Sequence, residues 1–393
     1  MLTHTPTHGP TLVDETFTPR YWAAVWALLH GSNLATSTLK QKLGHIEALY
    51  QHTESIGGSL DDDLSEMNFD RLGNALEAFF VQLRNVAVPS ASILVRWNTA
   101  FHFVRDTCHR LERNPSAGKQ IEGIQERIQR LDNLYLGLRP YKRRFGAKPR
   151  AIPRSVVAEL LDAVEPGSPK NPFKAEKTQW RVYVLVNLML LQGLRRGEAL
   201  SLPADFLKSE RDPRSGEYRW RLSVCTNETE DDPRALVPGI KTAQSIRIIP
   251  VAGTTARALQ TYSENFRGKV EHGFYVSSVR NQPLSLEGVN KALAVLSTAL
   301  SSSALKELFD LTGARVIRPH ALRHTCAVVR MKQLLAAGNT PEQAMMHLRS
   351  FFGWSKTSMM PLHYAKAALD ERLNETWNDN LDSRVTILRN LPE

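Results

Sequence analysis

Apolar residues recur at helical spacing along the first third of the chain. In TPRYWAAVWALLHGS, Trp22, Val25, Trp26 and Leu29 lie three or four positions apart, which indicates one apolar helix face. The segments SNLATSTLKQKLGHIEALYQHTE, DRLGNALEAFFVQLRNV and PSASILVRWNTAFHFVRDTCHRL follow in the same style, and no strand pattern competes with them. The sequence therefore predicts a small helical domain over residues 17–138, preceded by a flexible tail at 1–16.

The pattern changes after residue 154, where helices and strands are mixed. SVVAELLDAVE begins a second domain, and VYVLVNLMLL reads as a buried helix that stops at Gly193. EYRWRLSVC alternates apolar and polar residues as a half-buried strand does, and SIRIIPV is its expected antiparallel partner. Thr340 and Gln343, on either side of Pro341, predict a helix start. The expected fold class is α+β, mainly α with a small antiparallel sheet in a domain spanning 155–375, and a C-terminal tail at 376–393.

A basic segment, RPYKRRFGAKPRAIPR at 139–154, lies between the two predicted domains. It contains three prolines and no acid, so we expect a linker that could follow a phosphate backbone. The candidate DNA-contacting residues are Arg139, Lys142, Arg143, Arg144, Lys148 and Arg150.

Composition favours a globular protein with a polyanionic partner. Hydrophobic residues make up 42% of the 393 positions, charged residues 23%, and the formal net charge is +10. The longest apolar run is too short to span a bilayer, and no secretory signal is evident at the start, so we expect a cytoplasmic, nucleoid-associated protein without a membrane partner. The three cysteines are widely separated, which favours reduced thiols over disulfides.

The candidate chemistry lies in RPHALRHT and in FGWSKTSMMPLHYAK. His320 and Arg323 are three apart in a predicted helix, so both side chains should lie on one face. A guanidinium forms a forked pair of hydrogen bonds to phosphate, and an imidazole can move a proton near neutral pH. Tyr364 follows Pro361, which suits the first turn of a helix, and a phenol beside an arginine-bound phosphate is a possible nucleophile.

Two upstream segments carry further candidates. LQGLRRGEAL holds Arg195 and Arg196 at the end of the apolar helix, and the residues alone do not decide which one points inward. Lys241, in GIKTAQSIRIIPV, precedes a predicted strand at a position from which its ammonium could protonate a leaving oxygen.

Taken in chain order, these segments resemble the tyrosine recombinase (phage integrase) family over roughly residues 20–375. The resemblance rests on GLRRGE, IKT, HALRHT, FGW and HYAK, and it assigns the catalytic positions to Arg195, Lys241, His320, Arg323, Trp354 and the nucleophile Tyr364. Two departures are the ten-residue separation of Trp354 from Tyr364 and the long, acidic approach to Lys241, which contains Glu228, Glu230, Asp231 and Asp232.

The resemblance implies a two-domain clamp on double-stranded DNA, with a helical core-binding domain and a catalytic domain. It implies site-specific strand cleavage and rejoining through a 3′-phosphotyrosyl link, without metal or other cofactor, for integration, excision or transposition. The implied assembly is a tetramer on DNA, with accessory DNA-bending proteins as further partners. A type IB topoisomerase and a non-catalytic DNA-binding module of the same fold are the alternatives.

Overall fold

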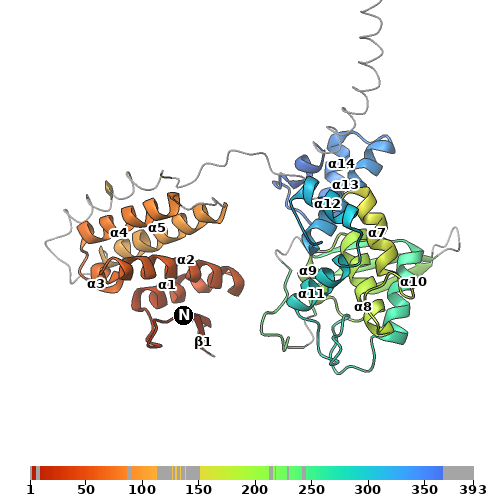
Figure 1. Cartoon of the computed structure of the whole chain (residues 1–393), viewed down its shortest axis with the longest axis horizontal. Coiled ribbons are helices and arrows are strands. Elements are labelled where there is room, and N and C mark those ends of the chain that lie inside the picture. The colour runs from red at the N-terminus through yellow and green to blue at the C-terminus, as the bar shows by residue number, and fades with distance from the viewer. Residues whose placement is uncertain are drawn as a thin grey trace, which may run out of the picture. The chain divides into compact units, whose positions relative to one another are not determined.

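The computed structural model describes residues 2–5 (backbone alone), 9–85, 91–112, 151–211, 218–227, 230–240 and 245–365, with a few isolated positions between them. The chain forms two compact units, residues 1–146 and 147–393 (Figure 1). Residues 139–150 of the predicted linker and the C-terminal tail at 376–393 lie outside the described residues, so the bounds proposed for these two segments stay predictions.

The first unit is helical, as its apolar spacing predicts. Leu43, Ile46 and Leu49, three or four apart on one face, are fully buried in α2, and Trp97 of α5 is fully buried in the same core. The described helices are α1 (Tyr21–Gly31), α2 (Thr36–Ser55), α3 (Leu60–Ser65), α4 (Phe69–Arg84) and α5 (Ala91–Glu112).

The expectation of a flexible tail at residues 1–16 is wrong. Strand β1 (Leu2–Thr5) pairs antiparallel with β2 (Gly9–Leu12), and Leu12 is 1% exposed among the core residues of α1 and α2. Gly9 has φ +79, a conformation open to glycine at little cost. Each strand has only four residues, too few for the sequence to show a clear alternation, so the hairpin was missed.

The second unit combines helices with a small sheet. Strands β3 (Leu207–Arg211), β4 (Tyr218–Val224) and β5 (Arg247–Val251) form an antiparallel sheet in the order β3-β4-β5. The predicted pairing of β4 with β5 is confirmed, with Leu222 opposite Ile249 and both side chains buried. Strand β3 was not predicted because it is an edge strand, LKSER, with mostly exposed side chains and no apolar alternation.

Two helices of the second unit pack against this sheet, α10 on β4 and α14 on β5. In Figure 1, α12, α13 and α14 lie at one end of the unit, and α8, α9 and α11 lie toward the other. The described helices are α7 (Arg154–Val164), α8 (Glu176–Val186), α9 (Arg196–Ser201), α10 (Gly253–Thr261), α11 (Leu286–Ser297), α12 (Ser302–Thr312), α13 (Pro319–Ala336) and α14 (Pro341–Phe352), with π-helical turns η2 (Asn187–Leu191) and η4 (Tyr262–Phe266).

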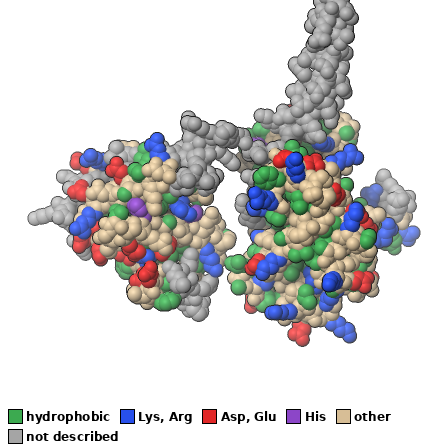
Figure 2. All heavy atoms as spheres, in the orientation of Figure 1, with side chains coloured by type: hydrophobic (Ala, Val, Ile, Leu, Met, Phe, Trp, Pro, Cys, Tyr) green, Lys and Arg blue, Asp and Glu red, His purple; other side chains and the backbone are tan. Residues whose placement is uncertain are grey.

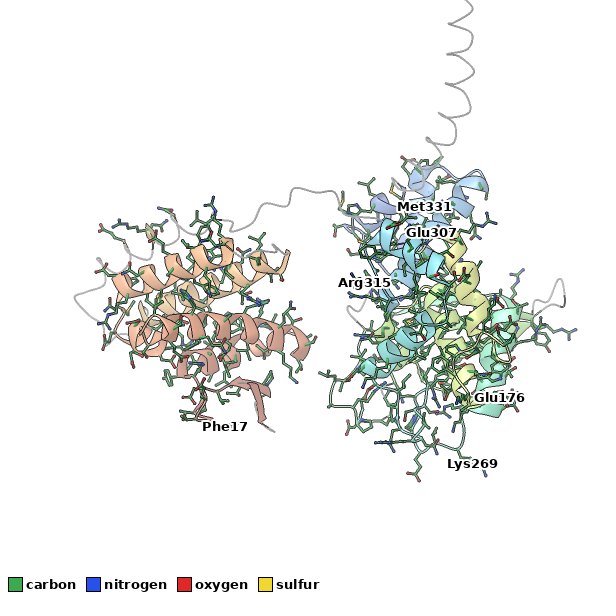
Figure 3. All side chains as sticks on the ribbon, in the orientation of Figure 1. Phe17, Glu176, Lys269, Glu307, Arg315 and Met331 are labelled. Carbon is green, nitrogen blue, oxygen red and sulfur yellow. The ribbon has the colours of Figure 1, made fainter. Side chains whose placement is uncertain are left out.

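Local signals explain the helices that carry the candidate residues. Thr340 accepts a hydrogen bond from the Gln343 amide and the Gln343 side chain accepts one from the Thr340 amide, which is the predicted capping box at the start of α14. Pro319 opens α13, and Met331 lies in a second apolar cluster between α13 and α14 (Figure 3). None of the helices among the described residues is long and apolar enough to cross a membrane.

Replacing Leu12 with alanine tests whether the hairpin belongs to the core. We expect Leu12→Ala to lower the free energy of unfolding of the first unit by about 2–5 kcal/mol, because it leaves a cavity among packed residues. Peptide-resolved hydrogen exchange of the full chain should show faster exchange in α1 and α2. Thr11→Ala on the same strand is the control, and equal exchange in both variants would contradict the prediction.

Candidate active site

The turn that carries Arg195 depends on a glycine. Helix α8 ends in the π-helical turn η2, and Gly193 then adopts φ +62. A Cβ atom at Gly193 would lie 2.4 Å from Cε1 of Phe352, so a side chain has no room here. The close approach of the turn to Phe352 therefore requires glycine, and it brings the start of α9 to the end of α14.

Arg195 precedes the first residue of α9 and is tied to that helix by Glu198. The Arg195 amide donates a hydrogen bond of 2.9 Å to Oε2 of Glu198, and the Arg195 guanidinium donates to Oε1. It also donates to the hydroxyl of Ser245 at 3.2 Å. The guanidinium of Arg195 is thus directed toward the segment that leads into β5.

Three arginines converge on the Glu198 carboxylate, whose side chain is fully buried. Arg195 binds Oε1, while Arg247 and Arg323 bind Oε2 at 3.1 Å and 3.3 Å. These arginines come from the start of α9, from β5 and from α13. One carboxylate therefore joins three elements and leaves an excess of positive charge around it.

Burial and charge act in opposite directions on this cluster. Burial alone would raise the pKa of Glu198, but Arg247, Arg323 and Arg195 hold it below its usual value. Burial lowers the pKa of Arg323 to about 9, with Glu198 opposing the shift and the other two arginines adding to it. Burial also lowers the pKa of Arg247, against the attraction of Glu198. The carboxylate is therefore ionised, and it is the group that makes the burial of these cations tolerable.

Arg323 is fixed by backbone as well as by Glu198. Its guanidinium donates to the carbonyl oxygens of Gly193 at 2.5 Å and Phe352 at 2.8 Å, and it is 3% exposed. It also lies over the rings of Phe352 and Trp354, at 4.9 Å and 5.7 Å from their centroids. These contacts occupy only part of the five N–H donors of a guanidinium.

The structure separates the two neighbouring arginines of GLRRGE. Arg195 joins the Glu198 cluster, whereas Arg196 donates to Oδ1 of Asn290 at 2.7 Å and to the Leu286 carbonyl at 3.3 Å, both on α11. Arg195 therefore shares the Glu198 carboxylate with Arg323, and it is the arginine that the family resemblance assigned.

Tyr364 and Trp354 lie beside this cluster. Tyr364 belongs to a helical segment at 360–365 and is 6% exposed. Its ring stacks on Trp354 with centroids 5.5 Å apart, and Trp354 stacks on Phe352 at 4.6 Å. The Tyr364 hydroxyl is hydrogen-bonded to Nδ1 of His324, a buried residue of α13. The phenolic oxygen thus has an imidazole as its immediate neighbour.

His320 lies at the start of α13, one turn before His324. Its side chain is exposed, and its ring meets the edge of His324 with centroids 4.2 Å apart. His320 and Arg323 are on the predicted helix, but they differ in environment, because Arg323 is buried against the Gly193 turn. Of these two residues, His320 is therefore the one that solvent reaches.

Two sets of predicted residues lie outside the described part of the chain. They are Lys241 and the basic linker residues Arg139, Lys142, Arg143, Arg144, Lys148 and Arg150. Of the acids near Lys241, Glu230 accepts a hydrogen bond from the Gly273 amide, and Asp232 pairs with Arg234 at 2.6 Å. Among the described residues, no group of three His, Cys, Asp or Glu side chains is arranged to hold a metal ion.

Sequence reasoning missed Arg247 and His324. In SIRIIPV, Ile246 and Ile248 are exposed and Ile249 is buried, so the strand alternation places Arg247 on the inner face. Its guanidinium donates to the carbonyls of Phe351 and Ser245, each at 2.7 Å. His324 stands four residues after His320, a spacing that puts the two imidazoles together on a helix. An inward arginine in a strand and a histidine pair were the available signals.

One curated protein is similar to this chain in sequence. No family model matches the chain. "Putative integrase/recombinase y4rE" of Sinorhizobium fredii is 28% identical over 200 residues, which are 48% of this chain and 53% of that protein. The match thus spans about half the length of that curated relative.

Solved structures extend the likeness to the fold. The XerH site-specific recombinase bound to palindromic difH substrate, in a post-cleavage complex, superposes with a TM-score of 0.51 at 12% identity, covering 90% of this chain and 83% of that one. The chain has the tyrosine recombinase fold. A lambda integrase dimer bound to a core site is also similar, with a TM-score of 0.43 at 14% identity over 86% of this chain and 96% of that one. The resemblance to tyrosine recombinases that the motifs indicated is confirmed.

Replacing Glu198 with glutamine tests the role of its charge in this recombinase fold. At neutral pH we expect Glu198→Gln to lower the free energy of unfolding by about 3 kcal/mol, because the buried guanidinium groups of Arg247 and Arg323, and the partly exposed one of Arg195, lose their counter-charge. The folded-state pKa of Glu198 is below 4.5, so the wild-type advantage is complete above about pH 4.5 and is lost as pH falls through the lower folded value. Urea denaturation of both proteins from neutral to acid pH measures the difference, and a gap that stayed constant with pH would contradict this account.

Proposed function

We propose that this chain is a site-specific DNA recombinase that cleaves and rejoins DNA through a 3′-phosphotyrosyl intermediate. The observation that carries the proposal is the convergence of Arg195 and Arg323 on buried Glu198, beside the stacked pair Trp354 and Tyr364. Two fixed guanidinium groups next to a phenol are what an attack of tyrosine on a phosphodiester requires. The sequence relative and the fold support the same class of activity.

In the proposed reaction, Arg195 and Arg323 bind the non-bridging oxygens of the scissile phosphate. A guanidinium keeps its donors in one plane and matches two phosphate oxygens at once. Glu198 holds both groups before substrate arrives, so little reorganisation is needed as charge develops on the oxygens. His320 and Trp354 complete the pocket, His320 from the solvent side.

Tyr364 is the proposed nucleophile. Its oxygen forms a bond to phosphorus while the bond to the 5′-oxygen breaks, and Lys241 protonates the leaving 5′-oxygen. The phosphodiester energy is kept in the phosphotyrosyl link, so a 5′-hydroxyl of a second duplex can reverse the step without ATP. Strand exchange follows when the attacking hydroxyl comes from a different duplex.

The proposed partner is double-stranded DNA, bound by a helical domain at 17–138 and a catalytic domain at 155–375. The basic linker at 139–154 would lie along the phosphate backbone, where arginine and lysine displace counterions. Lysine and arginine side chains are spread over the visible face of the second unit (Figure 2). We further propose a tetramer on two duplexes, aided by DNA-bending proteins and located with the nucleoid, in which the tail at 376–393 docks on a neighbouring subunit.

Covalent capture of DNA tests the nucleophile. The full-length protein is incubated with fragmented, randomly nicked genomic DNA from its source organism, and the DNA that remains attached after denaturation is sequenced. We expect recurrent attached sequences with wild type and none with Tyr364→Phe, because phenylalanine has no oxygen to form the phosphotyrosyl link. Tyr218→Phe, at a 65% exposed position of β4, is the matched control and should retain capture. An adduct that persists in Tyr364→Phe would refute the assignment.

The adjacent arginines allow a paired test of the phosphate site. On a captured sequence prepared as a nicked suicide duplex, we expect Arg195→Gln to lower the single-turnover cleavage rate by about 10²–10³-fold, the usual effect of losing one transition-state donor. Arg196→Gln should keep the rate within a few-fold, because that side chain binds α11 instead. Equal losses in the two variants would argue that the turn is only structural.

A further inference from the structure

The hydrogen bond between Tyr364 and His324 suggests a role that the family motif does not assign. Both side chains are more than nine-tenths buried, at 6% and 5% exposed. The contact joins the Tyr364 hydroxyl to Nδ1 of His324, and the two rings are 5.3 Å apart at 51°. A buried imidazole on the oxygen of the proposed nucleophile is placed to handle its proton.

We propose that His324 is the general base that takes the phenolic proton of Tyr364 as this oxygen attacks the phosphate. The inference rests on the proposed function, and it deepens it by separating the base from the acid. In cleavage, the bond from the Tyr364 oxygen to phosphorus forms, the bond from phosphorus to the 5′-oxygen breaks, and the phenolic proton passes to Nδ1 of His324. The 5′-oxygen receives its proton from a different group, proposed above as Lys241. In rejoining, both proton transfers run backward.

The surroundings of His324 suit this role. Trp354 stacks on the Tyr364 ring and keeps the phenol in place. His320 meets the His324 ring from the solvent side, and Arg323, one residue earlier on α13, is directed to Gly193, Phe352 and Glu198. His320 and Tyr364 are titratable groups in contact with the imidazole, and Arg323 is the charged group next to it in sequence.

The ordinary pKa values of a phenol and an imidazole show why the attack needs a base and why an imidazole can supply it. A phenol with a pKa near 10 is almost entirely protonated at neutral pH, whereas an imidazole, with an ordinary value of about 6.5, is mostly unprotonated and can accept. Acceptance at Nδ1 requires the tautomer with hydrogen on Nε2. Positioned proton transfer of this kind is worth about 10²–10⁴-fold in rate.

The test uses the suicide duplex that wild-type protein captures and measures single-turnover formation of the covalent adduct. His324→Asn places an amide near the position of Nδ1, so it can keep a hydrogen bond to Tyr364 but cannot take its proton. We expect its cleavage rate to fall by about 10²-fold or more with unchanged DNA affinity, and to rise with pH more steeply than that of wild type. His363→Asn, at the exposed histidine next to the nucleophile, is the matched control and should keep the wild-type rate.

A second substrate separates base from acid. A duplex with sulfur in place of the bridging 5′-oxygen has a leaving group of pKa about 8.5, as for a thiol, which departs without protonation. We expect the cleavage rate of Lys241→Ala to recover on this duplex and that of His324→Asn to remain low. Because a buried change can unfold the chain, His324→Gln serves as a second variant, and circular dichroism selects the folded one.

The outcomes that overturn the inference are distinct. A rate for His324→Asn within threefold of wild type would leave His324 with a positioning role only, and a faster rate would make the contact a restraint on Tyr364. Recovery of His324→Asn on the sulfur duplex would assign it to the acid side. Failure of the proposed function looks different, since wild type would then capture no DNA, or Tyr364→Phe would still capture it, and either result overturns both proposals.

Discussion

The candidate site depends on one buried carboxylate. Glu198 is fully buried and receives hydrogen bonds from Arg195, Arg247 and Arg323. Each of these cations would be costly to bury alone, because an unpaired charge loses its hydration without compensation. The Glu198 carboxylate accepts a hydrogen bond from each of the three guanidinium groups, but its single negative charge does not neutralise their three positive charges. The remaining positive charge makes the cluster a place where a phosphate would complete the balance.

Close packing around the carboxylate makes the cluster rigid. A Cβ atom on Gly193 would collide with the ring of Phe352, and a Cβ atom on Gly353 would lie 2.9 Å from Cα of Ser245, too close for a side chain there. The carbonyl oxygens of Gly193 and Phe352 then accept hydrogen bonds from Arg323, and that of Phe351 accepts from Arg247. The arginines are thus held by backbone as well as by charge. Preorganised donors of this kind contribute most to phosphoryl chemistry because they do not need to move when substrate binds.

Sequence reasoning succeeded where a local pattern is strong. The helical first unit, the pairing of β4 with β5 and the capping box at Thr340 follow from periodicity or from side-chain chemistry within a few residues. It failed for the hairpin at residues 2–12 and for β3, where short or exposed strands leave no alternation to detect. Within the site, it could not find Arg247 and Arg323 as partners of Glu198, because they come from segments that are distant in sequence. The contacts of His324 with Tyr364 and of Arg247 with Glu198 likewise cross the fold, and the local signals at these positions do not name either partner.

The geometry of α13 shows how one helix would serve the two chemical tasks proposed for Arg323 and His324. Successive residues of an α-helix point about 100° apart, so neighbours in sequence face different surroundings. Arg323 is turned toward the Glu198 cluster, and His324 is turned toward the Tyr364 hydroxyl. In the proposed reaction, a guanidinium therefore stands where the phosphate would bind, and an imidazole stands at the oxygen that would lose its proton. Exchanging these residue types would leave a phosphate facing a weak cation and a phenol facing a group that cannot accept a proton.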